Sequence, residues 1–230
     1  MGKKGLSQEG LKLIACITML ADHIGIVFLP EYIGFRLVGR MAFPIFCFLL
    51  VQGVQYTRNP VRYCGRLVIS MLISEFSFDF LLCGRPCFEA QSVMVTLLLG
   101  FLMVEFLKRI KPMPLKLLAA VPFAVVARLL RTDYDAIGIV FILIFYLAKE
   151  YNRGFLFIAA CITAVCFLLE SWVIPFMGLS IPVELFCLFS LIPIACYSGR
   201  KATDSRLIQW GFYLFYPVHL LIIGILYRCF

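Results

Sequence analysis

The sequence predicts an all-α fold, a polytopic transmembrane helical bundle, and three observations support this fold class. Of the 230 residues, 63% are hydrophobic and only 15% are charged, whereas a soluble domain is about half apolar and about a quarter charged. The apolar residues form runs long enough to cross about 30 Å of hydrocarbon. The sequence lacks the alternation of apolar and polar residues that is typical of membrane barrel strands. Residues 1–230 are therefore predicted to form a single integral membrane domain.

About nine transmembrane helices follow from the apolar runs, taken in order along the chain. A full crossing takes about 20 residues, so the second and sixth runs are short and are expected to be tilted or broken. The predicted spans are Leu11–Leu29, Met41–Val54, Tyr63–Leu82, Val93–Leu107, Leu115–Leu130, Ala136–Ala148, Gly154–Leu169, Ile181–Tyr197 and Leu207–Tyr227.

The positions of lysine and arginine predict the orientation of these helices. Cytoplasmic loops of membrane proteins carry an excess of Lys and Arg. With the N-terminus in the cytoplasm, more than two thirds of the 21 Lys and Arg residues fall on cytoplasmic flanks. The bundle is therefore predicted to be N-in and C-out. This asymmetry accounts for the net charge of +8, so we expect no nucleic-acid partner.

The ten cysteines do not indicate a redox or zinc motif. Most lie within apolar helices, where cysteine acts as a small hydrophobic residue, and there is no C-x-x-C pair. Cys83 and Cys87 flank a Gly-Arg-Pro turn. Their spacing allows a disulfide, and the sequence leaves open whether they are bonded.

Asp22 and His23 are the first candidate functional residues. Both follow a nearly uncharged apolar run and precede another apolar segment, Ile26–Leu29. Ionisable groups inside a bilayer are costly and usually face a bundle interior, a partner or a water-filled cavity. An aspartate beside a histidine can also orient the imidazole and raise its basicity, as a general base requires. The alternative is that the pair only marks the end of the helix at the interface.

Other ionisable side chains lie at a similar predicted depth. His23 lies eleven residues beyond Lys12, or roughly 17 Å along its helix. Glu75, Asp79 and His219 also reach the outer half of the membrane when their helices are followed from the cytoplasmic end. Both histidines of the chain thus fall in one layer, which favours a common site.

Glu75 and Asp79 are four residues apart, so they share one helix face. Two carboxylates inside a membrane need cationic partners or protons, and Arg36, Arg40 and Arg128 are the available cations at the outer end. The alternative is a purely structural ion-pair cluster that holds the bundle together.

The last span carries Tyr216 and His219 three residues apart, so their side chains point the same way. Pro217 lies between them and removes a backbone hydrogen bond, which can kink or open the helix. A packing helix whose histidine donates to a carbonyl is the alternative interpretation.

A row of arginines at positions 58, 62 and 66 has helical spacing on the predicted cytoplasmic side. Arg58, Arg62 and Arg66 are candidates for binding the phosphates of a nucleotide-like cosubstrate. The positive-inside rule explains the same row equally well.

The chain resembles the TraX family in several segments. These segments are M-x-x-DHIG, GRMAFPIFCFLLVQG, RLVIS…ISE and FYLFYPVHLLIIG. The match runs nearly end to end, and a more distant similarity extends to the acyltransferase-3 membrane proteins. Asp-His-x-Gly and Tyr-Pro-x-His are specific in combination. Gln52 stands where the family pattern leads us to expect an acidic residue. The positions that match the family's polar motifs are Asp22, His23, Arg40, Glu75 and His219.

The resemblance implies an activity, a cosubstrate and a location. TraX-family proteins are named for a bacterial membrane protein that acetylates the N-terminus of conjugative pilin. The expected donor is acetyl-CoA, and the expected acceptor is an amine or hydroxyl in the cell envelope, with a pilin as one candidate. No metal is expected. The expected location is the bacterial inner membrane, with several crossings of the lipid bilayer.

The working hypothesis is an integral membrane acyltransferase. His23, Asp22, His219 and Glu75 are its candidate catalytic residues. The candidate substrate-binding residues are Arg36, Arg40, Asp79, Arg128 and Tyr216. A proton-coupled carrier or flippase is the alternative, because intramembrane histidines and acids also suit proton relays. A scaffold with a buried polar cluster is the third option.

Overall fold

The computed structural model describes residues 5–87, 89–150, 152, 154–168, 173–176, 179–203 and 205–229. It is 79% helical, which confirms the all-α class predicted from the apolar runs. The chain divides into two compact units. Unit 1 comprises Met1–Leu49 and Ala148–Phe212, and unit 2 comprises Leu50–Leu147 and Tyr213–Phe230. That the chain acts as one integral membrane domain stays a prediction.

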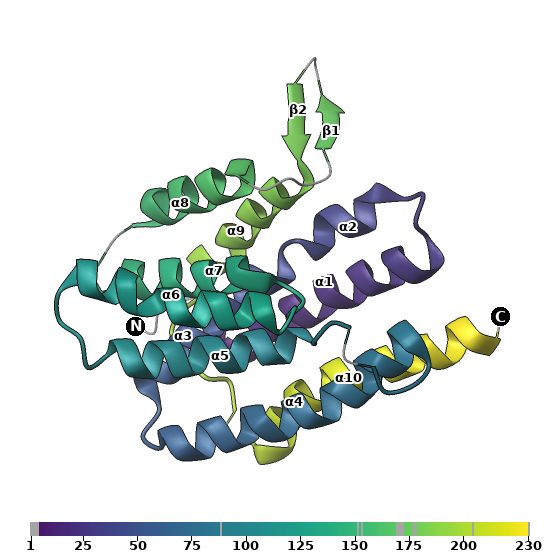
Figure 1. The fold of residues 1–230 in the computed structure, drawn as a ribbon, viewed down its shortest axis with the longest axis horizontal. Coiled ribbons are helices and arrows are strands. Elements are labelled where there is room, and N and C mark those ends of the chain that lie inside the picture. Colours follow the sequence, from purple (N-terminus) through teal and green to yellow (C-terminus); the bar gives the residue numbers. More distant parts are fainter. Residues whose placement is uncertain are drawn as a thin grey trace. The chain divides into compact units, whose positions relative to one another are not determined.

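Unit 1 is built from both ends of the chain. Its first stretch holds α1 (Gln8–Phe28), α2 (Ile33–Gly39) and the beginning of α3 (Ala42–Tyr56). α1 and α2 pack against each other, and Figure 1 shows them side by side. The second stretch holds α8 (Phe155–Leu168), the strands β1 (Val173–Phe176) and β2 (Leu179–Pro182), the 3-10 helix η1 (Val183–Ser190), α9 (Leu191–Ala195) and the first turns of α10 (Arg206–Cys229). The two strands form an antiparallel hairpin that pairs Val173 with Pro182.

Unit 2 contains α4 (Pro60–Cys83), α5 (Val93–Leu107), α6 (Met113–Leu129), α7 (Asp135–Glu150) and the remainder of α10. α5 packs against both α4 and α6. The start of α4 is fixed by Asn59, whose side chain accepts a hydrogen bond from the backbone N–H of Arg62, and by Pro60 in the first turn. Its end is fixed by Gly84 in the left-handed conformation, with φ of 69°.

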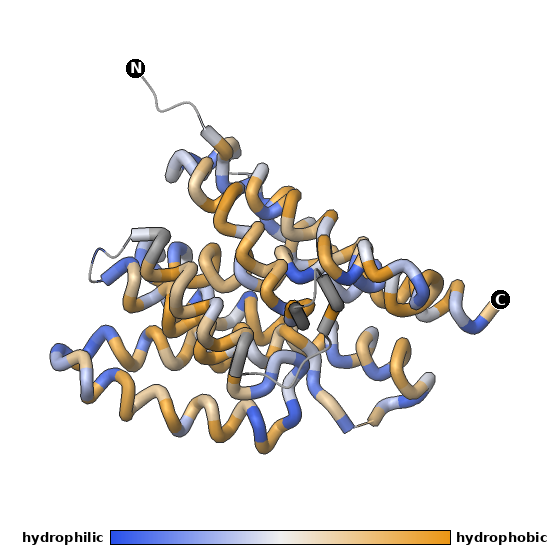
Figure 2. Tube along the Cα trace, turned by 90° about the horizontal axis from the view of Figure 1, so that it is seen from above, coloured by the Kyte–Doolittle hydropathy of each residue, from blue (hydrophilic) through white to orange (hydrophobic). Residues whose placement is uncertain are grey.

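α4 turns its polar face inward and its apolar face outward. Ser70, Ser74, Ser77 and Asp79 are buried. The Oγ of Ser70 donates to the carbonyl of Tyr213 at 3.1 Å. The opposite face exposes large apolar side chains, namely Ile69, Leu72, Ile73 and Phe76. Figure 2 shows that apolar residues make up most of the length of the helices. Such an exposed apolar face would promote aggregation in water, whereas it is compatible with contact with lipid.

Among the described residues, three helical stretches are long and apolar enough to cross a membrane. They are α1, the stretch Ile33–Tyr56 that joins α2 and α3, and α10. The third to seventh predicted spans each coincide with one helix, although the number of crossings and their orientation stay predictions. α3 begins at Ala42, one residue after the predicted start of the second span at Met41, but a further helix, α2, precedes it and packs on α1. The eighth span was predicted from Ile181, whereas Ile181 lies in β2, and the rest of this span consists of the 3-10 helix η1 and α9.

Contacts between loops agree with the predicted alternation of crossings. Leu6 pairs with Tyr197 in unit 1, and both lie on the predicted cytoplasmic side. Gln91 pairs with Thr132 in unit 2, and both lie on the predicted outer side. In each unit, therefore, segments assigned to the same side of the bilayer meet at the same end.

Candidate functional site

The first polar site lies in unit 1, where one carboxylate binds two guanidinium groups. The Oδ1 of Asp22 accepts a hydrogen bond from Arg36 at 3.0 Å and one from Arg40 at 3.3 Å, and its Oδ2 accepts from Arg40 at 3.1 Å. We call these three residues the Asp22 cluster. Asp22 lies in the penultimate turn of α1, Arg36 lies in α2, and Arg40 ends α2. The side chains of Arg36 and Arg40 are 29% and 14% exposed.

The close packing of α2 on α1 brings the cluster together. A side chain at Gly39 would collide with Asp22, and one at Gly25 would collide with Phe35. Both glycines therefore allow the two helices to approach closely enough for the arginines to reach the carboxylate. Both arginines were predicted as cations at the outer end; the structure places Arg36 within α2 and Arg40 at its C-cap.

His23 follows Asp22 on α1 and is half-buried. Adjacent helical side chains point about 100° apart, so His23 lies on the flank of the Asp22 cluster. Both oxygens of Asp22 contact arginine. Its predicted role of orienting the imidazole of His23 stays a prediction.

The second polar site lies in unit 2, where Glu75 binds the beginning of α5. The Oε1 of Glu75 accepts hydrogen bonds from the backbone N–H of Ser92 at 3.0 Å and from its Oγ at 2.5 Å. Ser92 is fully buried and is the N-cap of α5. A carboxylate at a helix N-terminus is stabilised by the unpaired N–H groups and the helix dipole. Ser92 was missed in the sequence, although a serine just before an apolar run is a typical helix start.

His219 lies on α10, is 6% exposed, and is held by its own helix. Its Nδ1 lies 2.7 Å from the carbonyl oxygen of Phe215. A carbonyl only accepts, so Nδ1 carries the proton and Nε2 carries the lone pair that a base would use. The ring stacks on Phe215 at 5.0 Å and meets the edge of Tyr216 at 5.6 Å. α10 remains helical through Pro217.

Tyr216 connects His219 with the Glu75–Ser92 pair. Its ring meets the imidazole of His219 at 5.6 Å, and its buried hydroxyl lies within electrostatic range of Glu75 and Asp133. Asp133 is held by its backbone N–H, which donates to the carbonyl of Gln91 at 2.8 Å. We call Glu75, Ser92, Tyr216 and His219 the His219 cluster. Three of its four members were predicted from the sequence.

Other candidates have different partners from those expected. Asp79 accepts from the backbone N–H of Cys87 at 3.0 Å. Neither Glu75 nor Asp79 forms an ion pair with Lys or Arg among the described residues, so the expectation of cationic partners is wrong there. Backbone N–H groups satisfy these carboxylates instead. Arg128 pairs with Asp135 at 3.2 Å, and its side chain is 76% exposed.

The arginine row is only partly helical. Arg58 precedes the first residue of α4, Pro60, so the expected i, i+4, i+8 row is wrong for that position. Arg62 is exposed in the first turn. The guanidinium of Arg66 lies over the rings of Tyr63 at 5.6 Å and Tyr213 at 5.9 Å. Arg58 and Arg62 are thus open to an anion, whereas Arg66 is engaged with aromatic rings.

The two clusters offer complementary chemistry, each within its own unit. The Asp22 cluster presents two guanidinium groups against one carboxylate, which suits an oxyanion or another anionic group. The His219 cluster presents an imidazole with its lone pair on Nε2, which suits proton transfer. That His23 and His219 meet in one pocket stays a prediction, because the two residues belong to different units.

Comparison with known proteins gives matches that cover nearly the whole chain. A family model described as TraX protein matches residues 7–227. The chain is 30% identical over 237 aligned residues to a probable fimbrial assembly protein FimC, serogroup H1, from Dichelobacter nodosus, covering 91% of each chain. It is 49% identical over 53 residues to an uncharacterised protein of Rickettsia prowazekii, covering 23% of this chain and 21% of that protein. No solved structure matches.

Proposed function

The chain belongs to the TraX protein family, and from that premise we propose that it is an integral membrane acyltransferase. It transfers an acetyl group from acetyl-CoA to an amine or hydroxyl of a cell-envelope acceptor. The observation that supports this most is the Asp22 cluster, because two guanidinium groups are fixed on Asp22, the residue that precedes His23 near the end of a membrane-length helix. The relative described as a fimbrial assembly protein makes a pilin N-terminus the first acceptor to test.

The proposed reaction joins acceptor and acetyl group and releases the CoA thiol. The acceptor nitrogen or oxygen attacks the thioester carbonyl, and His23 takes the proton that the acceptor loses. Arg36 and Arg40 stabilise the negative charge on the carbonyl oxygen in the tetrahedral intermediate. The carbon–sulfur bond then breaks, and the thiolate takes the proton from His23. His219, with Tyr216 and Glu75, serves as a second proton-transfer group or positions the acceptor.

Acetyl-CoA is proposed to approach from the predicted cytoplasmic side. Its phosphates need cations, and Arg58 and Arg62 are suitably open. Arg66 is held between Tyr63 and Tyr213, so it is proposed to shape this end of α4 rather than to bind phosphate directly. The proposed location is the bacterial inner membrane, with the N-terminus inside.

The test is acetyl transfer by purified protein in lipid nanodiscs. Radiolabelled acetyl-CoA is mixed with a cell-envelope extract, and label in protein, glycan and lipid fractions is measured. We expect transfer by the native protein and none by the His23→Ala variant. Ile26→Ala is the matched control, because Ile26 is exposed on the same helix and has no proposed role.

Two other outcomes of this experiment would contradict parts of the proposal. Full transfer by His23→Ala would remove His23 as the base. No transfer and no CoA release by native protein, together with uptake of a substrate driven by a proton gradient, would replace the enzyme with a proton-coupled carrier.

A further inference from the structure

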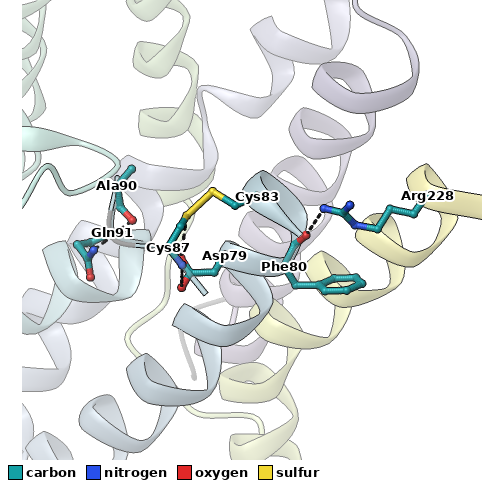
Figure 3. Close-up of a disulfide and its surroundings, with 7 residues drawn as sticks. All are labelled: Asp79, Phe80, Cys83, Cys87, Ala90, Gln91 and Arg228. Atoms are coloured by element: carbon teal, nitrogen blue, oxygen red, sulfur yellow. Dashed lines mark hydrogen bonds between the residues drawn. A yellow bond between two sulfur atoms is a disulfide. The ribbon is translucent and has the colours of Figure 1, made fainter. Parts of the chain in front are cut away.

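The outer end of α4 is fastened to the loop that follows it. Cys83, the last residue of α4, is joined by a disulfide to Cys87, which answers the question that the sequence left open. The backbone N–H of Cys87 donates to the Oδ2 of Asp79, one turn before the end of α4 (Figure 3). The disulfide from Cys83 and the hydrogen bond to Asp79 therefore both attach Cys87 to the end of α4.

The same end of α4 is fastened to α10. The guanidinium of Arg228 donates to the carbonyl of Phe80 at 2.8 Å and lies over the Phe80 ring at 5.0 Å (Figure 3). A cation suits this position, because the last carbonyls of a helix carry partial negative charge. A side chain at Gly84 would run into the guanidinium of Arg228, so the left-handed glycine that ends α4 also leaves room for this contact.

Close packing continues one turn earlier on α10. A side chain at Gly224 would meet Phe80 at 3.0 Å and the backbone of Leu81 at 3.4 Å. Gly224 lies between His219 and Arg228 on the same helix. The segment of α10 that carries the imidazole therefore has its far end fixed by α4.

We propose that the Cys83–Cys87 disulfide, Asp79 and Arg228 form a redox-dependent clip that positions the end of α10 on α4. Closing the clip removes two electrons and two protons from the thiols of Cys83 and Cys87. A protein disulfide oxidant of the cell envelope accepts them by thiol–disulfide exchange. Such oxidants act outside the cytoplasm, so the loop after α4 lies on the outer side. This proposal does not depend on acyl transfer.

The first experiment determines the redox state and the side of the loop. Intact cells are treated with a membrane-impermeant maleimide, then reduced, then treated with a second maleimide, and the peptides are read by mass spectrometry. Cys83 and Cys87 are expected to carry only the second label. Cys229 and Cys196 are exposed free thiols at the predicted outer and inner ends, and they serve as controls for sidedness. In cells without the disulfide oxidant, Cys83 and Cys87 are expected to carry the first label.

The second experiment measures the positioning of α10 by amide hydrogen exchange in nanodiscs. Reduction is expected to raise exchange near the C-terminal end of α10 by about tenfold, since easier local opening raises exchange. Cys83→Ser is expected to raise it equally and to abolish the effect of reductant. Arg228→Ala is expected to raise it as well, whereas Arg228→Lys, which keeps a cationic donor, recovers part of the protection. Arg206→Ala, at the exposed beginning of α10, is the matched control.

Two results would overturn the proposal. One is a first-step label on Cys83 and Cys87 in wild-type cells. The other is unchanged exchange at the end of α10 after both reduction and Arg228→Ala, which would leave the disulfide as a local loop closure without influence on α10.

Discussion

The Asp22 cluster and the His219 cluster satisfy their acids in opposite ways. In unit 1, Asp22 binds charged side chains, Arg36 and Arg40, at 3.0 to 3.3 Å. In unit 2, Glu75 binds neutral donors, the N–H and hydroxyl of Ser92. The first arrangement places two cations on one carboxylate. The second places a carboxylate at the start of a helix, with no ion pair to Lys or Arg among the described residues.

This difference separates two tasks that one active site needs. A pair of guanidinium groups can stabilise a developing oxyanion only if it is held in place and not fully neutralised. An imidazole can transfer protons when one ring nitrogen is held by a hydrogen bond and the other can accept a proton. We therefore expect substitutions in the Asp22 cluster to change stability and turnover mainly because they alter the balance of charge. Substitutions in the His219 cluster are expected to change them mainly because they shift the positions of hydrogen-bonding groups.

The largest expected effect comes from removing Asp22. Asp22→Ala leaves two partly buried guanidinium groups without their carboxylate, and breaking such a pair costs roughly 3–5 kcal/mol. Thermal unfolding in nanodiscs measures the loss. Asp22→Asn keeps the shape and one acceptor oxygen, so a loss of the same size in both variants would confirm a charge effect. A stable Asp22→Ala protein would mean that the arginines have other partners.

The next effect concerns the contact of Arg40 with both oxygens of Asp22, which one guanidinium nitrogen makes at 3.3 and 3.1 Å. Arg40→Lys keeps the charge but replaces the planar guanidinium and its remaining N–H donors by a single ammonium, so the position of the donors changes. Loss of a positioned oxyanion donor lowers turnover by about a hundredfold, and we expect that loss in acetyl transfer with little change in unfolding temperature. Arg36→Lys, which loses a contact to one oxygen only, is the comparison and is expected to lose less. Equal and small losses would remove Arg40 from the oxyanion site.

A smaller effect is expected in the His219 cluster. Ser92→Ala removes the hydroxyl donor to Glu75 but keeps the backbone N–H, and a hydrogen bond to a charged group contributes roughly 1.5–3 kcal/mol. Ser77→Ala is the matched control, because Ser77 is buried on α4 but bonds only a carbonyl of its own helix at 3.4 Å. Chemical denaturation compares the two variants. Equal stability would show that the backbone N–H alone holds Glu75.

The smallest effect is expected at Arg128. Its pair with Asp135 is largely exposed, and exposed ion pairs contribute about 0–1 kcal/mol. Arg128→Ala is therefore expected to leave the unfolding temperature unchanged. Acetyl transfer by this variant then reports directly on substrate binding, and unchanged transfer would remove Arg128 from the candidate site.

The helices were predictable because their apolar runs are long. α1 and α10 coincide with predicted spans almost to the residue. α2 was not predictable, since its seven residues include two glycines and an arginine and read as a loop. Its helical state depends on packing against α1 through Gly25 and Gly39, which no local pattern reveals.

The site was predictable in its residue types but not in its pairings. Asp22 was chosen as an intramembrane charge, and Arg36 and Arg40 as cations at the outer end, yet their mutual contact depends on the α1–α2 packing. The partner of Glu75 is Ser92, which lies in the next helix, and sequence spacing alone could not pair them. Arg58 was misplaced although Pro60 is a typical first helical residue. A short cross-link between cysteines at positions 23 and 219 would test whether the two histidines meet.

The division of unit 1 between both ends of the chain has a consequence for biogenesis. Leu6 pairs with Tyr197, and ribosomes add about 5–20 residues per second, so roughly ten to forty seconds separate the synthesis of these partners. The packing of α2 on η1 forms only after this delay, so α1 and α2 are synthesised well before the later segments that complete unit 1.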